Sequence, residues 1–249
     1  MREKLSAWVD THREEVVGLL SELVAIPSVT GDEGPIQAFV AERLRGMGLE
    51  VAVFEPDHEA LKRHPAYVEV SRGYEGRPNV VGTLRGAGGG RSLLFNGHVD
   101  VIPVGPLEPW AHPPFAAEIE GGRLYGRGAS DMKAGLAAMT MAVAAVRGCG
   151  VRLAGDVLLE YTVDEELSGN GTLDCVMRGY RADAGICCET SSMRVQPASI
   201  GRIWWEIRVR GKAAGIQRRW EGVNAIEKAW RVVQAVAEYE KLRVSRLSH

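Results

Sequence analysis

"LLFNGHVDVIPV", residues 93 to 104, is the stretch that decides the fold and raises the first question about function. A short apolar run ends abruptly in Asn96 and Gly97, and His98 and Asp100 follow. Such a run is typical of a buried strand. Ionisable side chains at its end need partners, because burying an unpaired charge is costly. The stretch therefore predicts a strand whose end carries a functional site.

The segments around this strand alternate between helix and strand patterns. Apolar spacing and composition predict helices over residues 3–25, 30–48 and 131–147. We expect strands over residues 49–55, 79–86, 92–99, 120–128, 155–166 and 182–189, with a glycine turn joining 79–86 to 92–99. This alternation favours an α/β fold with an open, mostly parallel sheet that helices cover on both faces.

The pattern changes near Pro197. Residues 200–214 alternate between apolar and polar side chains, which is typical of a half-exposed antiparallel strand, and residues 224–242 form an amphipathic helix pattern. We therefore predict an incomplete catalytic domain over residues 1–196 and the first half of a smaller α+β domain over 197–249. Because one strand and one helix do not readily close a core of their own, we expect the sequence to be cut short.

Composition and charge exclude several classes of function. The formal net charge is -2, which does not favour nucleic acid as a partner. No apolar run approaches the roughly 18 residues of a membrane span, and the charged N-terminus has no signal-peptide pattern. These features predict a cytoplasmic protein that binds neither nucleic acid nor a membrane.

Ionisable residues stand at the ends of several predicted strands. His98 and Asp100 end one strand, Glu165 and Glu166 end another, and Glu189 ends a third. Asp131 opens the predicted helix 131–147. The carboxyl ends of the strands form the ligand-binding edge of an open α/β sheet, and carboxylates gathered there repel one another unless cations neutralise them. The sequence therefore predicts a metal site, with a pair of metal ions favoured.

The residue types indicate which metal and which roles. Histidine and carboxylate ligands without cysteine favour zinc or a similar divalent ion in a catalytic site. Asp100 lies where it can accept the second ring N–H of His98 and fix its tautomer, and Asp131 at a helix N-terminus should stay ionised and could bridge two ions. In extended backbone Glu165 and Glu166 point to opposite faces, so one would bind metal and the other would act as general base.

Each of these residues also has a purely structural interpretation. Asp131 alone would be a helix cap, His98 alone a satisfied core histidine, and Glu165 with Glu166 a solvated loop. Their gathering at one sheet edge is what favours the metal site.

Five segments in order resemble the co-catalytic zinc amidohydrolases, the family of acetylornithine deacetylase, succinyl-diaminopimelate desuccinylase, aminoacylase and glutamate carboxypeptidases. They are "NGHVDVIPVG", "W…PPF", "GGRLYGRGASDMKAG", "VDEELSGNGT" and the segment of Glu189. The resemblance covers essentially the whole chain. It implies a metal-dependent hydrolase of N-acyl amino acids or small peptides.

The resemblance also implies a role for each site residue. His98 and Glu189 would bind one zinc ion, Glu166 the other, and Asp131 both. Cobalt or manganese could replace zinc. Asp100 would orient His98. Glu165 would be the general base that activates a bridging water.

The sequence departs from the family pattern at two places. The family's catalytic domain resumes after a lid domain and there supplies a final histidine ligand, whereas this chain stops within the expected lid. The family's lid histidine, which stabilises the oxyanion in the partner subunit's site, is replaced by the segment Gly215, Ile216 and Gln217. The lid would also make a homodimer possible.

Three hypotheses follow from these features. The first is an active amidohydrolase. The second is a truncated, impaired or inactive family member that binds at most one metal ion tightly. The third is a zinc aminopeptidase with a similar core, against which the lid-type segment after Pro197 argues.

Overall fold

Two units, Met1–Val195 and Gln196–His249, make up the chain. The computed structural model describes residues 1–197, 201 and 205–246. The division falls one residue before the predicted boundary. That the second unit is half of a lid domain remains a prediction.

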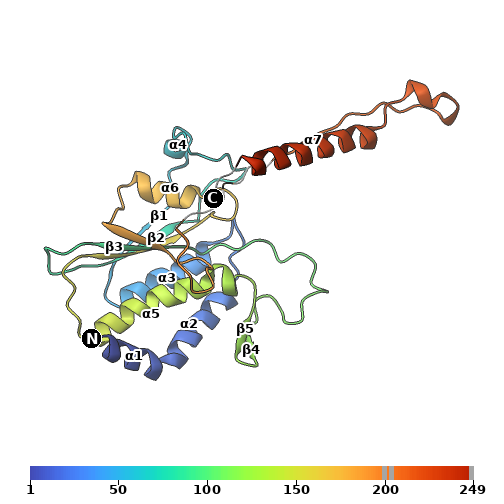
Figure 1. Cartoon of the computed structure of the whole chain (residues 1–249). Coiled ribbons are helices and arrows are strands. Elements are labelled where there is room, and N and C mark those ends of the chain that lie inside the picture. Colours follow the sequence, from blue (N-terminus) through green and yellow to red (C-terminus); the bar gives the residue numbers. More distant parts are fainter. Residues whose placement is uncertain (198–200, 202–204, 247–249) are drawn as a thin grey trace. The chain divides into compact units, whose positions relative to one another are not determined.

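A five-stranded sheet forms the centre of the first unit (Figure 1), in the order β1-β2-β6-β3-β7. Its strands are β1 (Glu50–Phe54), β2 (Asn79–Leu84), β3 (Leu93–His98), β6 (Val157–Thr162) and β7 (Ala184–Cys187). The strands β6, β3 and β7 run parallel, whereas β1 and β2 are antiparallel at the other side. A separate hairpin pairs β4 (Glu118–Glu120) with β5 (Arg123–Tyr125).

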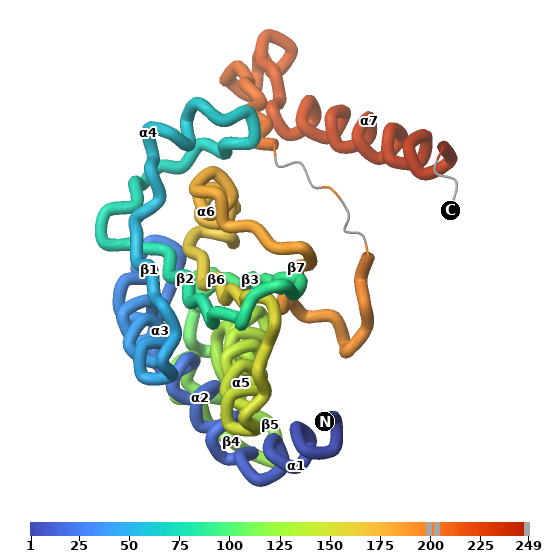
Figure 2. Tube along the Cα trace, turned by 90° about the vertical axis from the view of Figure 1, so that its left-hand side faces the viewer, coloured from blue at the N-terminus to red at the C-terminus, as the bar shows by residue number. Residues whose placement is uncertain are grey.

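Helices lie on both faces of this sheet. Those of the first unit are α1 (Arg2–Thr11), α2 (Arg13–Ala25), α3 (Gly34–Gly46), α4 (His58–Leu61), α5 (Ala134–Gly148) and α6 (Asn170–Met177). Figure 2 shows α3 and α5 on one face and α6 on the opposite face. The predicted α/β fold is confirmed.

The core explains why β6 occupies the middle of the sheet. Every residue of β6 is buried, as a parallel strand covered on both faces should be. Leu159 of β6 belongs to a continuous apolar cluster with Ile36 and Leu44 of α3 and Leu136 of α5. Each Å² of apolar surface that this cluster removes from water stabilises the fold by about 25 cal/mol.

A glycine-rich segment joins β2 to β3 as expected, but the two strands do not pair, because the buried strand β6 lies between them. One local expectation was wrong. The predicted helix 3–25 is two helices that break at His12, where the Thr11 hydroxyl donates to the carbonyls of Ala7 and Trp8. Such side-chain bonds compete with the helical ladder.

The second unit contains one long helix, α7 (Ala225–Ser245). The Asn224 side chain caps it by accepting from the Ile226 amide at 2.9 Å. A short 3-10 helix, Ile216–Glu221, precedes it, and a single bridge pairs Lys212 with Val223.

The strand predicted over residues 200–214 is not seen in the part that the structure describes. Residues 200 and 202–204 lie outside that part, and residues 205–211 form no strand. Among the described residues these have no neighbouring strand to complete a ladder. Instead Trp205 and Ile207 line an apolar hollow with Val233 of α7. Within the described ranges, no helix has both the length and the apolar character needed to cross a membrane.

Glu160 of β6 provides a test of the buried sheet. Glu160 is only 3% exposed, and its carboxylate accepts a hydrogen bond from Asn96 Nδ2 at 3.0 Å. Burial raises the pKa of Glu160 above its usual value, so the native state holds this proton more tightly than the unfolded chain does. The stabilisation that results is present at low pH and is lost as the pH rises through the folded-state pKa.

We therefore expect Glu160→Gln, which cannot ionise, to gain stability relative to the original chain as the pH rises. Urea denaturation of both proteins at about pH 4, below the usual pKa of a glutamate, and at about pH 8 measures this difference. Titrations that the two proteins share cancel in the comparison. An equal difference in the free energy of unfolding at the two pH values would contradict the assignment.

Candidate metal centre

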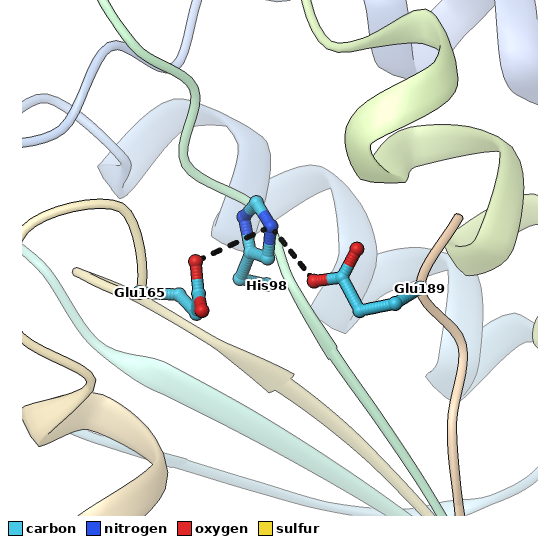
Figure 3. A group of neighbouring side chains, drawn as sticks. All are labelled: His98, Glu165 and Glu189. Atoms are coloured by element: carbon cyan, nitrogen blue, oxygen red, sulfur yellow. Dashed lines mark ion pairs between the residues drawn. The ribbon is translucent and has the colours of Figure 1, made fainter. Parts of the chain in front are cut away.

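Three adjacent parallel strands bring the predicted site residues to one edge of the sheet. His98 is the last residue of β3, Glu165 lies three residues beyond β6, and Glu189 lies two residues beyond β7. Figure 3 shows the His98 ring between the carboxylates of Glu165 and Glu189. The prediction that these residues converge rested on this property of parallel strands.

One ring nitrogen of His98 faces several carboxylates. The Nε2 atom lies 3.2 Å from Asp131 Oδ1, 3.3 Å from Glu189 Oε1 and 3.7 Å from Glu165 Oε2. Possible ligand atoms lie within 4.8 Å of one another in two groups, His98 with Glu165 and Glu189, and His98 with Asp131 and Glu166. All four predicted metal ligands are therefore close together.

Two glycines allow the backbone to approach this closely. A Cβ atom on Gly97 would lie 2.6 Å from Leu136 Cδ2 and 2.7 Å from Met132 Cε, so a side chain at residue 97 would displace the ends of these two side chains beside His98. A Cβ atom on Gly135 would lie 1.9 Å from the Cys188 carbonyl oxygen. This second glycine lets the segment before Glu189 lie against the start of α5.

Asp131 is placed differently from the expectation. It does not cap α5, whose N-cap is Lys133, but lies in an irregular turn, Ala129–Lys133, with φ -116° and ψ 97°. The extended backbone directs the carboxylate toward His98 and leaves 59% of the side chain exposed. Asp131 therefore owes its position to the turn and not to the helix N-terminus.

Lys133 anchors this turn, and the sequence analysis missed it. Its buried Nζ atom donates to the carbonyl oxygens of Leu23 at 2.8 Å and Ile26 at 2.9 Å. These carbonyls lie at the C-terminal end of α2, where cations are favoured. Burial lowers the pKa of Lys133 to about 7. The signal available in the sequence was a lysine two residues beyond a candidate ligand, at the start of an otherwise apolar helical segment.

Asp100 lies beside the His98 ring, but its closest contact is made by the backbone carbonyl oxygen and not, as expected, by the carboxylate. The Nδ1 atom of His98 lies 2.8 Å from the backbone carbonyl oxygen of Asp100 and 3.5 Å from its Oδ1 atom. The fully buried carboxylate accepts the amides of Glu165 at 3.0 Å and Glu166 at 3.2 Å, and the Thr30 hydroxyl at 2.8 Å. Asp100 therefore connects the histidine to the backbone that carries both glutamates.

The expected extended backbone at Glu165 and Glu166 was wrong. Both residues lie in a turn that follows β6, because their amides bond to one carboxylate, that of Asp100. In the turn both side chains contribute to groups that contain His98. Their separate roles remain predictions.

The electrostatics of the centre favour a cation. Burial opposes a charge on His98, but hydrogen bonds to Asp100 and Glu189 and the neighbouring carboxylates raise its pKa to about 11. Burial and the carboxylates of Glu189, Asp100 and Asp131 raise the pKa of Glu165. The hydrogen bond from His98 lowers the pKa of Glu189. The proton on His98 thus partly neutralises the site.

This donor set fits a divalent metal ion. Imidazole and carboxylate ligands suit zinc and similar ions in catalytic sites, and exchanging the His98 proton for a metal ion would supply the missing positive charge. Among the described residues, the two groups that could hold a metal both contain His98.

Comparisons with known proteins agree with this site. The sequence profile of peptidase family M20/M25/M40 matches residues 94–245. N-formyl-4-amino-5-aminomethyl-2-methylpyrimidine deformylase of Bacillus subtilis is 34% identical over 94% of this chain and 54% of its own length. Succinyl-diaminopimelate desuccinylase of Leptothrix cholodnii is 39% identical over 72% of this chain and 44% of its own.

A solved structure extends the likeness to the fold. Human carnosine dipeptidase 1 has a TM-score of 0.62 and 25% identity, over 75% of this chain and 41% of its own. The chain spans about half the length of the relatives that it matches. The profile match covers more than half of the chain and includes His98, Asp131, Glu165, Glu166 and Glu189. The chain therefore belongs to peptidase family M20/M25/M40.

Proposed function

We propose that this protein hydrolyses amide bonds at a metal centre built around His98. The observation that carries the proposal is the Nε2 atom of His98, which faces Asp131, Glu165 and Glu189 within 3.7 Å in a member of peptidase family M20/M25/M40. The names of the relatives describe removal of formyl and succinyl groups, and a dipeptidase. Their common chemistry is an amide bond.

In this proposal the residues of the site have separate roles. His98, Asp131 and Glu189 would hold one metal ion, and Asp131 and Glu166 would hold a second. A bound metal ion polarises the amide carbonyl and lowers the pKa of a coordinated water. Zinc is the metal that we propose, with cobalt or manganese as possible replacements.

Glu165 is the general base in this proposal. Its side chain is about half exposed and reaches the cluster without being buried in it. It takes a proton from the attacking water and passes it to the leaving amine. Asp100 keeps Glu165 in place through the backbone amide and supports His98 from the opposite side.

We propose an N-acyl amino acid or a small peptide as the substrate, because these join a small acyl group to an amine as the named relatives' substrates do. We also propose that the protein works in the cytoplasm and forms a homodimer through residues 197–249. An open hollow between Trp205, Ile207 and α7 leaves apolar surface in that unit for a partner.

Zinc binding should depend on His98 and on pH. At about pH 6 the His98 proton competes with zinc, because the pKa of His98 is raised to about 11 in the metal-free chain. The apparent affinity should therefore increase between about pH 6 and pH 8. Isothermal titration of the metal-free protein with zinc measures this.

His98→Ala should weaken zinc binding by about tenfold or more, because the variant lacks one of the metal ligands. The matched control is His64→Ala, since His64 follows α4 and does not belong to either ligand group. Equal zinc binding by His98→Ala and the original chain would exclude the proposed centre. A saturating ratio of one zinc per chain would instead support the hypothesis of a single tight site.

Glu165→Gln should separate catalysis from metal binding. The amide side chain keeps the size of the glutamate but cannot accept the proton of the water. We expect kcat for amine release from N-acyl amino acids to fall by about 10²–10⁴ while zinc content stays unchanged. Activity of the variant at the original level would show that another group is the base.

A further inference from the structure

Asp164, the residue before the two glutamates, has an unusual backbone conformation. Its φ is 64°, in the left-handed region that residues other than glycine seldom adopt. Such conformations persist where the surroundings hold them in place, and they occur often at functional sites. The conformation turns the chain sharply between the buried strand β6 and the turn that carries Glu165 and Glu166.

A buried network holds the Asp164 carboxylate. This side chain is 2% exposed and accepts hydrogen bonds from the Tyr74 hydroxyl at 2.7 Å and from Arg77 Nη2 at 3.3 Å, with the Ser168 hydroxyl as a further donor. Arg77 is itself fixed by two bonds of 2.7 Å to the buried carboxylate of Glu33. The network connects the turn to the start of α3 and to the segment before β2.

The same turn is held by backbone bonds on both sides. The Asp164 carbonyl oxygen accepts the amides of Ser168 at 3.2 Å and Gly169 at 2.8 Å. On the other side the Asp100 carboxylate accepts the amides of Glu165 and Glu166. With these bonds in place, the backbone angles at Asp164 set the direction in which both glutamates leave the strand.

We propose that Asp164 is a positioning residue, which Arg77 and Tyr74 hold in the left-handed conformation so that Glu165 and Glu166 point into the metal centre. Asp164 touches neither substrate nor metal in this proposal and acts through its neighbours. The inference rests on the proposed function, which assigns Glu166 to a metal ion and Glu165 to proton transfer.

Three substitutions at one position separate the backbone from the carboxylate. Asp164→Asn keeps the acceptor oxygen and tolerates the left-handed conformation. Asp164→Gly keeps only the conformational freedom. Asp164→Ala keeps neither. The proposal ranks the variants in that order, with alanine the most impaired.

Cobalt alone is the probe, because its visible absorption spectrum reports the ligands of the bound ion. We expect Asp164→Ala to bind the more weakly held Co²⁺ ion about 10–100-fold less tightly and with a changed spectrum. For amide hydrolysis, kcat should fall by a similar factor, whereas KM should stay within about twofold. The reason is that the two glutamates act on the chemical step more than on substrate binding. Asp164→Asn should recover most of both losses.

Two further variants keep the test decisive if Asp164→Ala does not fold. Tyr74→Phe removes one donor to Asp164, together with the bond that Asn170 Nδ2 donates to the Tyr74 hydroxyl, and keeps the ring that lies against Arg77. It should shift the Co²⁺ spectrum in the same direction, by less. Val40→Ala, in the core side of α3, should lower stability while keeping every hydrogen bond of the network, and it should leave the spectrum unchanged.

The possible outcomes distinguish the two proposals. If the original chain binds no Co²⁺, the proposed function fails. If it binds Co²⁺ and hydrolyses amides while Asp164→Ala and Tyr74→Phe keep the same spectrum and kcat, the positioning role alone is wrong. A spectral shift in Val40→Ala equal to that in Tyr74→Phe would likewise contradict the positioning role, because loss of stability alone would then account for the shift.

Discussion

Repulsion between like charges at one edge of a sheet is the constraint on which this structure depends. The carboxylates of Asp100, Asp131, Glu165, Glu166 and Glu189 gather around His98, whose ring is almost fully buried. Repulsion within such a cluster is relieved by positive charge in its midst or by protonation of a carboxylate. In the metal-free chain the proton of His98 supplies part of that charge. A divalent ion would supply more, and the imidazole and carboxylate groups gathered there suit such an ion.

Several contacts around the site hold the backbone segments that carry its side chains. Gly97 and Gly135 let α5 and the segment before Glu189 approach closely. Lys133 ties the turn of Asp131 to the end of α2. Asp100 binds the amides of both glutamates. Each of these contacts helps to define a backbone position from which a side chain of the site projects.

The fold class and the position of the site could be predicted because they depend on patterns that a sequence displays directly. Apolar runs that end in ionisable residues indicated which strand ends meet, and the neighbouring positions of β6, β3 and β7 agree with that. Their exact order was less accessible, since placing β6 between β2 and β3 depends on long-range packing. The strand expected over residues 200–214 depended on a partner strand that the described residues do not provide.

Local geometry at the site escaped prediction for a related reason. The turn at Glu165 and Glu166 depends on the buried carboxylate of Asp100, which is far away in the sequence. The left-handed backbone at Asp164 depends on Tyr74 and Arg77 in the same way. Side-chain periodicity carries no signal for such contacts, whereas the adjacent carboxylates in "VDEE" showed that chemistry was concentrated there.

Anomalous X-ray diffraction from crystals of the zinc-loaded protein, recorded at the zinc edge, tests the central claim most directly. The account predicts an anomalous peak about 2.0–2.1 Å from His98 Nε2 and about 2.0–2.2 Å from carboxylate oxygens of Asp131 and Glu189. Zinc bound elsewhere on the chain, with His98 Nε2 hydrogen-bonded to the carboxylates and no peak beside it, would contradict the account.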